Sequence, residues 1–341
     1  MSLLLAIGVG ALFATLFPTI TITQLPHYEF VLNTILGIGL YGAVHGINLK
    51  GFRTHQGLIL RAITFGVLLK NIIIGGLMWI IFQTPLAFLL AIIVTQIDPL
   101  SVAHLIKKKS SKFSKSARTI LSAWASFDDP MTVILALYVF LPMLQWKHFT
   151  VIEGFIQIGV NLLLALVIFV LWNHFKRTNI SQLFLLFFAF LISLWLQLLL
   201  AIAIVALFVR PRITYLPQII HGAFLISAVI LGSLIKFDPQ SIIYGVTLGA
   251  IAFFAQGIAT LIVAPKLKRI DKLFLSFAQY NGITSIILAL IIAENIPQVL
   301  NIIGFAILTI NGLYYGVNYV LEWRLRYHVL LLPLLIARSV H

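Results

Sequence analysis

The sequence predicts an all-α polytopic membrane protein of about 12 transmembrane helices, arranged as an inverted repeat with two broken helices. Its 341 residues are 61% hydrophobic and only 9% charged, whereas a soluble domain has about 45–50% apolar and about 25% charged residues. Apolar runs of about 20 residues, each long enough to span a bilayer, recur along nearly the whole chain. Similar glycine-containing patterns appear in its two halves. Cys is absent, which excludes disulfides and thiolate metal sites.

The first span is expected to be retained, because the N-terminus lacks the basic region and the small-residue cleavage site of a signal peptide. Residues 181–209 are expected to cross twice as two short or broken helices, since a single crossing would place Arg210 and Arg212 on the wrong side. The expected segments are residues 3–23, 29–48, 57–82, 86–106, 117–140, 149–173, 181–196, 197–209, 218–235, 240–264, 272–294 and 297–319.

Basic residues gather in the loops on one side of this arrangement, so that side and both termini are expected to be cytoplasmic. The net charge of +14 is therefore a sign of topology and not of nucleic-acid binding. A secondary expectation is that residues 107–118 bind anionic lipid head groups. The basic side contains Lys50, Arg53, Lys107, Lys108, Lys109, Lys112, Lys115, Arg118, Lys176, Arg177, Arg210, Arg212, Lys266, Lys268, Arg269, Lys272, Arg324 and Arg326, and the other side little beyond Lys147 and Lys236.

The two halves share a pattern that runs in opposite directions. Residues 36–50 (LGIGLYGAVHGINLK) and 225–236 (LISAVILGSLIK) are glycine-spaced apolar runs closed by Lys, and the second segment after each is interrupted, near 95–99 and near 279–282. Inverted halves with broken helices are typical of transporters whose site lies at the midplane. The single domain 1–341 should therefore contain a first core repeat at 29–140, linking or scaffold helices at 149–209, a second repeat at 218–319 and an interfacial tail at 321–341.

Three of the nine acidic residues lie near the middle of expected spans: Asp98, Asp128 and Asp129. At 1.5 Å per residue, each is about 17–18 Å from its helix end, near the bilayer centre. A charge there costs at least about 2.5–3.5 kcal/mol, which makes an intramembrane acid a functional hypothesis by default. The fourth and fifth spans run in opposite directions, so the carboxylates can meet. The alternative is that they cap helix breaks or form a static buried ion pair.

Prolines beside these carboxylates are expected to create a cation site. Pro99 should break the fourth helix at Asp98, and Pro130 should do the same after the acidic pair, freeing the carbonyl of Ser126. Freed carbonyls beside carboxylates suit a hard cation such as Na⁺ or K⁺. Adjacent carboxylates in a low dielectric cannot both stay ionised without compensation, so the pocket should bind either a cation or a proton. Competition between the two in one alternating-access pocket is antiport.

Lys70 lies midway along the third segment, nine residues after Arg61 and so about 13 Å deeper, at the level of the aspartates. A neighbouring carboxylate would keep a buried lysine charged, and we expect Lys70 to pair with Asp128 when the site is empty. The alternative is a lysine that snorkels to the membrane interface.

The quoted motifs resemble those of the monovalent cation:proton antiporter superfamily, the sodium/proton exchangers. GLYGAVHGINLKGFR resembles the family's glycine-rich core helix, TQIDP its Thr-Asp-Pro break, SFDDP its Asn-Asp or Asp-Asp pair, and AQYNGITSIILALIIAENIP (278–297) its second broken helix. The resemblance implies crossed broken helices moving like an elevator against a dimerisation scaffold in a homodimer of the cell (plasma or inner) membrane. It implies that Asp129 is the essential carboxylate and that H⁺ and Na⁺, Li⁺ or K⁺ are cargo, with no cofactor.

Three departures from the family pattern bear on the site. Ile97 replaces the family's ligand threonine, and Thr95 is the nearest hydroxyl. Gln256 and Asn281 stand where the family often has basic residues, which leaves Lys70 as a substitute cation. The expected ion and proton ligands are therefore Asp129, Asp128, Asp98, Thr95 and Ser126, with Asp129 and Asp98 on the transported cation, and Lys70, Asn281 and Gln256 are ion-pair or gating candidates.

Other functions fit the residues less well. An intramembrane aspartyl protease also pairs two aspartates, but usually with a Gly-x-Gly-Asp element that is absent here. A membrane prenyltransferase needs further acids after Asp128 and Asp129, where the chain reads Pro-Met-Thr-Val. An uncoupled or channel-like cation or proton pathway is the more serious alternative, because the expected basic residues are missing.

Overall fold

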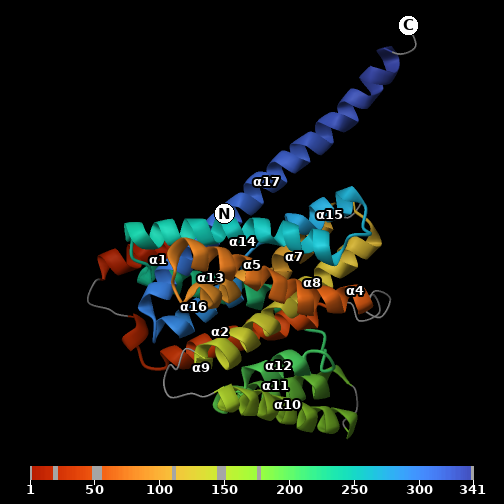
Figure 1. Cartoon of the computed structure of the whole chain (residues 1–341). Helices are drawn as coiled ribbons and strands as arrows, with labels where there is room; N and C mark the ends of the chain where they lie inside the picture. The colour runs from red at the N-terminus through yellow and green to blue at the C-terminus, as the bar shows by residue number, and fades with distance from the viewer. Residues whose placement is uncertain are drawn as a thin grey trace.

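The computed structural model describes residues 2–17, 22–47, 56–109, 113–143, 151–174 and 178–338, and these form helices without a strand (Figure 1). Within these ranges, six helices are long and apolar enough to cross a membrane, or seven if one bent pair counts as a single span. The all-helical membrane fold predicted from the sequence is thus confirmed at this level. Lys50, Arg53, Lys112, Lys147, Lys176 and Arg177 lie outside the described residues.

The helices of the first half follow the expected segments closely. They are α1 (Ser2–Leu16), α2 (Tyr28–His45), α4 (Gln56–Arg61) with the π-helical turn η2 (Ala62–Gly66) and α5 (Val67–Phe82), α6 (Ala87–Thr95), α7 (Pro99–Lys109), and α8 (Lys115–Val133) with η3 (Ile134–Phe140) and α9 (Leu141–Met143).

The second half comprises α10 (Val151–His174), α11 (Asn179–Trp195), α12 (Leu199–Val205), α13 (Leu216–Leu234), α14 (Pro239–Val263), α15 (Arg269–Ser276), α16 (Ile283–Ala293) and α17 (Pro297–Arg338). α10, α11 and α12 lie together at one edge of the molecule, where α12 packs on α2 and α10 on η3 (Figure 1). α17 continues without a break through 321–338 and extends away from the other helices; the interfacial position of this tail stays a prediction.

The segment 181–209 turns back on itself. α11 ends at Trp195, Gln197 adopts a left-handed φ of 57°, and α12 begins two residues later. The N–H of Arg212 donates to Asn179 Oδ1 at 2.6 Å, so the two ends of this segment lie at the same level. The segment therefore consists of two short helices and returns to the level at which it began, and its two membrane crossings stay a prediction.

Pro130 does not break its helix, and this expectation was wrong. α8 runs through Pro130 to Val133 and continues as η3. A proline removes only its own N–H from the helix ladder, and packed neighbours in a membrane protein keep such helices continuous. The fifth span thus carries Asp128 and Asp129 on a continuous helix.

Small residues allow two helix pairs to approach closely. A Cβ on Gly10 of α1 would overlap Val229 O of α13, and one on Gly232 would overlap Ile7 O. On α14, a Cβ on Gly249 would lie 2.7 Å from the carbonyl oxygen of Ala306 on α17. Close approach through small residues is the usual way helices associate in lipid, and it fixes α14 and α17 around the site described next.

Candidate functional site

Two interrupted helices meet at their breaks. α6 ends at Thr95 and α7 begins at Pro99, with a bend of 40°; α15 ends at Ser276 and α16 begins at Ile283. These are the two places where the sequence predicts interruptions. The N–H of Asp98 donates to Tyr280 O at 2.8 Å, which joins the two non-helical segments directly.

Side-chain amides bind the carbonyls that the first break leaves without helical partners. Gln279 Nε2 donates to Val94 O and to Gln96 O, each at 2.9 Å, and Asn281 Nδ2 donates to Val94 O at 3.2 Å. The second break is anchored to α17, because Asn311 exchanges two hydrogen bonds with the backbone of Asn281. The expectation of freed carbonyls open to a cation is thus only partly met, since these amides occupy several of them.

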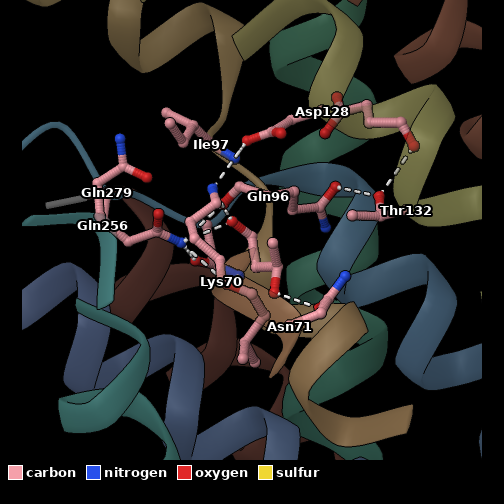
Figure 2. A network of polar contacts seen from close by, with 12 residues as sticks. Lys70, Asn71, Gln96, Ile97, Asp128, Thr132, Gln256 and Gln279 are labelled. Carbon is pink, nitrogen blue, oxygen red and sulfur yellow. Dashed lines mark hydrogen bonds and ion pairs between the residues drawn. The ribbon is translucent and has the colours of Figure 1, made fainter. Parts of the chain in front are cut away.

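Lys70 and Asp128 form a fully buried ion pair (Figure 2). Lys70 Nζ lies 3.2 Å from Asp128 Oδ2 and donates to Thr95 O at 2.6 Å. The N–H of Ile97 donates to the same carboxylate oxygen at 3.1 Å. Because neither side chain of the pair is exposed, the snorkelling alternative for Lys70 was wrong. The pair joins α5 to α8 at the level of the first break.

Asp129 has different surroundings from its neighbour. It is 2% exposed and, among the described residues, forms no ion pair. Asp98 and Asp128 both lie within electrostatic range of it. The fully buried amide of Gln96 contacts it: with the nitrogen turned toward Asp129, the amide donates to Oδ1 at 2.5 Å. Asp129 is therefore a buried carboxyl whose partners are uncharged, and no basic side chain of the described residues balances its negative charge.

Asp98 lies at the start of α7 and against the second break. Its Oδ2 accepts from the N–H of Ser101 at 2.7 Å, so it caps α7, as the alternative interpretation of these acids expects. A Cβ on Gly282 would overlap Asp98 Oδ1, so only glycine allows this approach. On its other side is a cavity of about 400 Å³ between the break and the first half of α7. Its lining includes Asp98, His104, His221, Tyr280, Tyr314 and Tyr315.

The remaining predicted residues contribute in other ways. The hydroxyl of Thr95 donates toward Asn71 Oδ1 (2.6 Å) and Ala91 O (2.7 Å), so it is occupied away from the carboxylates. Gln256 Nε2 donates to Leu275 O at 3.2 Å, at the end of α15. Ser126 is buried on α8. Within the described ranges, no group of three or more His, Cys, Asp or Glu side chains is arranged so that it could hold a metal ion.

Sequence reasoning missed the uncharged polar residues of the site. Gln96, Gln279, Asn71 and Thr132 are all buried around the breaks (Figure 2). The available signal was their position, because each is a polar side chain inside an apolar span at the level of the aspartates. An amide buried in hydrocarbon needs a partner as much as a carboxylate does.

Comparisons with known proteins identify the family and the fold of this chain. The family described as "Sodium/hydrogen exchanger, transmembrane" matches residues 2–210, more than half of the chain. Two solved structures of the sodium proton antiporter MjNhaP1 from Methanocaldococcus jannaschii share its fold. One, at pH 8, has a TM-score of 0.68 with 16% identity over 92% of this chain and 94% of that chain. The other has a TM-score of 0.63 with 18% identity, over 92% and 88%. No curated protein matches the sequence.

Proposed function

Because this chain belongs to the sodium/hydrogen exchanger family, we propose that it exchanges a monovalent cation for protons by alternating access. Na⁺ is the first choice of cation, with Li⁺ or K⁺ as alternatives. The chain is a multi-pass membrane transporter and not an enzyme, so the aspartyl protease and prenyltransferase alternatives are set aside.

One observation carries this proposal: two adjacent buried carboxylates have different partners. Lys70 compensates Asp128 at 3.2 Å, whereas Asp129 has no basic partner among the described residues. A buried carboxylate without a fixed counter-charge is costly to keep ionised. It therefore takes up a mobile positive charge, and the two available are a proton and a cation. Both cannot neutralise the same carboxylate at once, which is the condition for exchange.

Asp98 supplies a second carboxylate on the path to Asp129. It faces the cavity of about 400 Å³ beside α7, and the basic loop that follows α7 marks the cytoplasmic side by the distribution of Lys and Arg. In this proposal a hydrated cation enters through that cavity, passes Asp98 and loses its water at Asp129. Movement of the two broken helices then exposes the site to the opposite side.

The finer architecture belongs to the same proposal. The chain crosses the membrane twelve times, with inverted repeats at 29–140 and 218–319, scaffold helices at 149–209 and both termini in the cytoplasm. It works as a homodimer in the cell membrane, and residues 107–118 bind anionic lipid. Each point is open to a direct test, for example by cysteine labelling from either side, since the chain has no Cys of its own.

Transport by reconstituted protein tests the function. Vesicles with an imposed pH gradient receive Na⁺, Li⁺ or K⁺, with the voltage either free or clamped. We expect cation-dependent proton flux that Asp129→Asn abolishes. Proton or cation flux that persists without the counter-ion would identify the channel-like alternative. The absence of any cation-dependent proton flux would reject exchange.

A further inference from the structure

Gln96 is the side chain whose placement neither the ion pair nor the helix breaks explain. It lies in the non-helical segment between α6 and α7, is fully buried, and reaches past its own break to contact α8 and α16 (Figure 2). The amide lies between Asp129 on one side and Ser285 on the other. Gln279, by comparison, binds only groups of the two breaks, through three carbonyls of the first break and Asn281 of the second.

The Gln96 amide has different partners in its two possible orientations. With the nitrogen toward Asp129, the amide donates to Asp129 Oδ1 at 2.5 Å, and its oxygen accepts from the N–H and the hydroxyl of Ser285. With the oxygen toward Asp129, it accepts from Thr132 Oγ1 at 3.3 Å, and its nitrogen donates to Ile93 O at 3.3 Å and to Ser285 Oγ. In this second orientation the amide oxygen also faces Asp129 Oδ1 and the nitrogen faces the N–H of Ser285, so the first orientation is the one that matches an ionised Asp129.

The charge on Asp129 decides between these orientations. An ionised carboxylate is only an acceptor, so it requires the nitrogen of Gln96. A protonated carboxyl donates its O–H to the amide oxygen, and a bound cation also requires an oxygen on this side. Proton and cation thus select the same orientation. The other charged groups around Asp129 are Asp98 and Asp128, the latter paired with Lys70.

No other uncharged side chain of the first break offers this oxygen. Thr95 is occupied by Asn71 and Ala91, and Ile97 has no polar atom. Amide oxygens are hard ligands of the kind that alkali and alkaline-earth cations prefer.

We propose that Gln96 is a specificity-determining residue whose amide oxygen, together with Asp129, binds either the transported cation or the proton that replaces it. When the site holds neither, the amide turns and its nitrogen compensates the ionised carboxylate. This proposal rests on the proposed exchange function, because it assigns the second oxygen of the same site.

Gln96→Leu tests the proposal, with two readouts on the full-length protein. Calorimetric titration with NaCl, LiCl and KCl in detergent measures binding, and flux in proteoliposomes measures KM and kcat. We expect the dissociation constant and the KM of the favoured cation to rise at least about tenfold, as ligand-shell losses typically do, while kcat at saturating cation persists. Asn161→Leu is the control, because it removes a buried amide outside the site. The Asn161 amide accepts from the N–H of Ala201 and donates to Gln157 O, and its loss should leave the KM of the cation unchanged.

Gln96→Glu keeps an oxygen at the same place and should retain cation binding. This second variant keeps the proposal testable if Gln96→Leu fails to fold. An unchanged KM in Gln96→Leu, or loss of binding in Gln96→Glu, would overturn the proposal. If the wild-type protein binds a cation without transporting it, and Gln96→Leu weakens that binding, the exchange function fails and the assignment of Gln96 stands. A wild-type protein that neither binds nor transports would overturn both.

Discussion

Replacing Lys70 with Met removes the positive charge of the buried pair at nearly constant volume. At 3.2 Å and an effective dielectric constant of about 20, the attraction between Lys70 and Asp128 is about 5 kcal/mol. Removing one partner leaves the other buried and uncompensated, and we expect a loss of about 3–5 kcal/mol in the free energy of unfolding. The double variant Lys70→Met/Asp128→Asn removes both charges of the pair. It should therefore be more stable than Lys70→Met alone, which leaves the Asp128 carboxylate uncompensated.

Denaturant titrations in mixed micelles of the wild type, both single variants and the double variant measure this coupling. We expect an interaction energy of at least about 2 kcal/mol, within the range of residues that share a network. Lys115→Met removes an exposed lysine at the start of α8 and should change stability little. If the effects of the two single variants simply add, the ion pair contributes nothing and the different roles assigned to Asp128 and Asp129 lose their basis.

Three further predictions follow from other contacts. Gly282→Ala displaces the Asp98 carboxylate that lies against it, so proton flux should fall at least about tenfold, the effect expected of a misplaced ligand; flux within twofold of wild type would contradict this. Gly249→Val forces α14 away from Ala306 of α17 and should lower the free energy of unfolding by about 1–3 kcal/mol in the same titrations. The N–H of Ser241 lowers the pKa of Asp238 at the exposed start of α14. Asp238→Asn should therefore reduce thermal stability at neutral pH. The difference from the wild type should shrink as the pH falls through that lowered pKa, because Asp238 of the wild type then becomes neutral as well.

The sequence could predict how deep the charged residues of the site lie in the bilayer. Three aspartates and one lysine at similar distances from their helix ends indicated a common level in the bilayer, because the rise per residue is constant. The partner of Lys70 followed, since a buried lysine needs a carboxylate and few exist. The two interruptions were also predictable from Pro99 and from the Asn-Gly of the second half.

Local geometry at the breaks was not predictable in the same way. The direction of Gln96, the occupation of Thr95 by Asn71, and the use of Gln279 on three successive carbonyls depend on how two irregular segments pass each other. No periodicity describes such segments. Pro130 shows the opposite error, because a local rule predicted a break where surrounding helices keep α8 continuous.

Proton release on cation binding tests the central claim most directly. Purified protein in weakly buffered detergent solution, held at a pH where Asp129 is protonated, receives NaCl while the released protons are counted with an indicator dye. We expect about one proton released per cation bound, because both occupy the same carboxylate, and no release from Asp129→Asn. Cation binding without proton release in the wild type, or unchanged release in the variant, would contradict it.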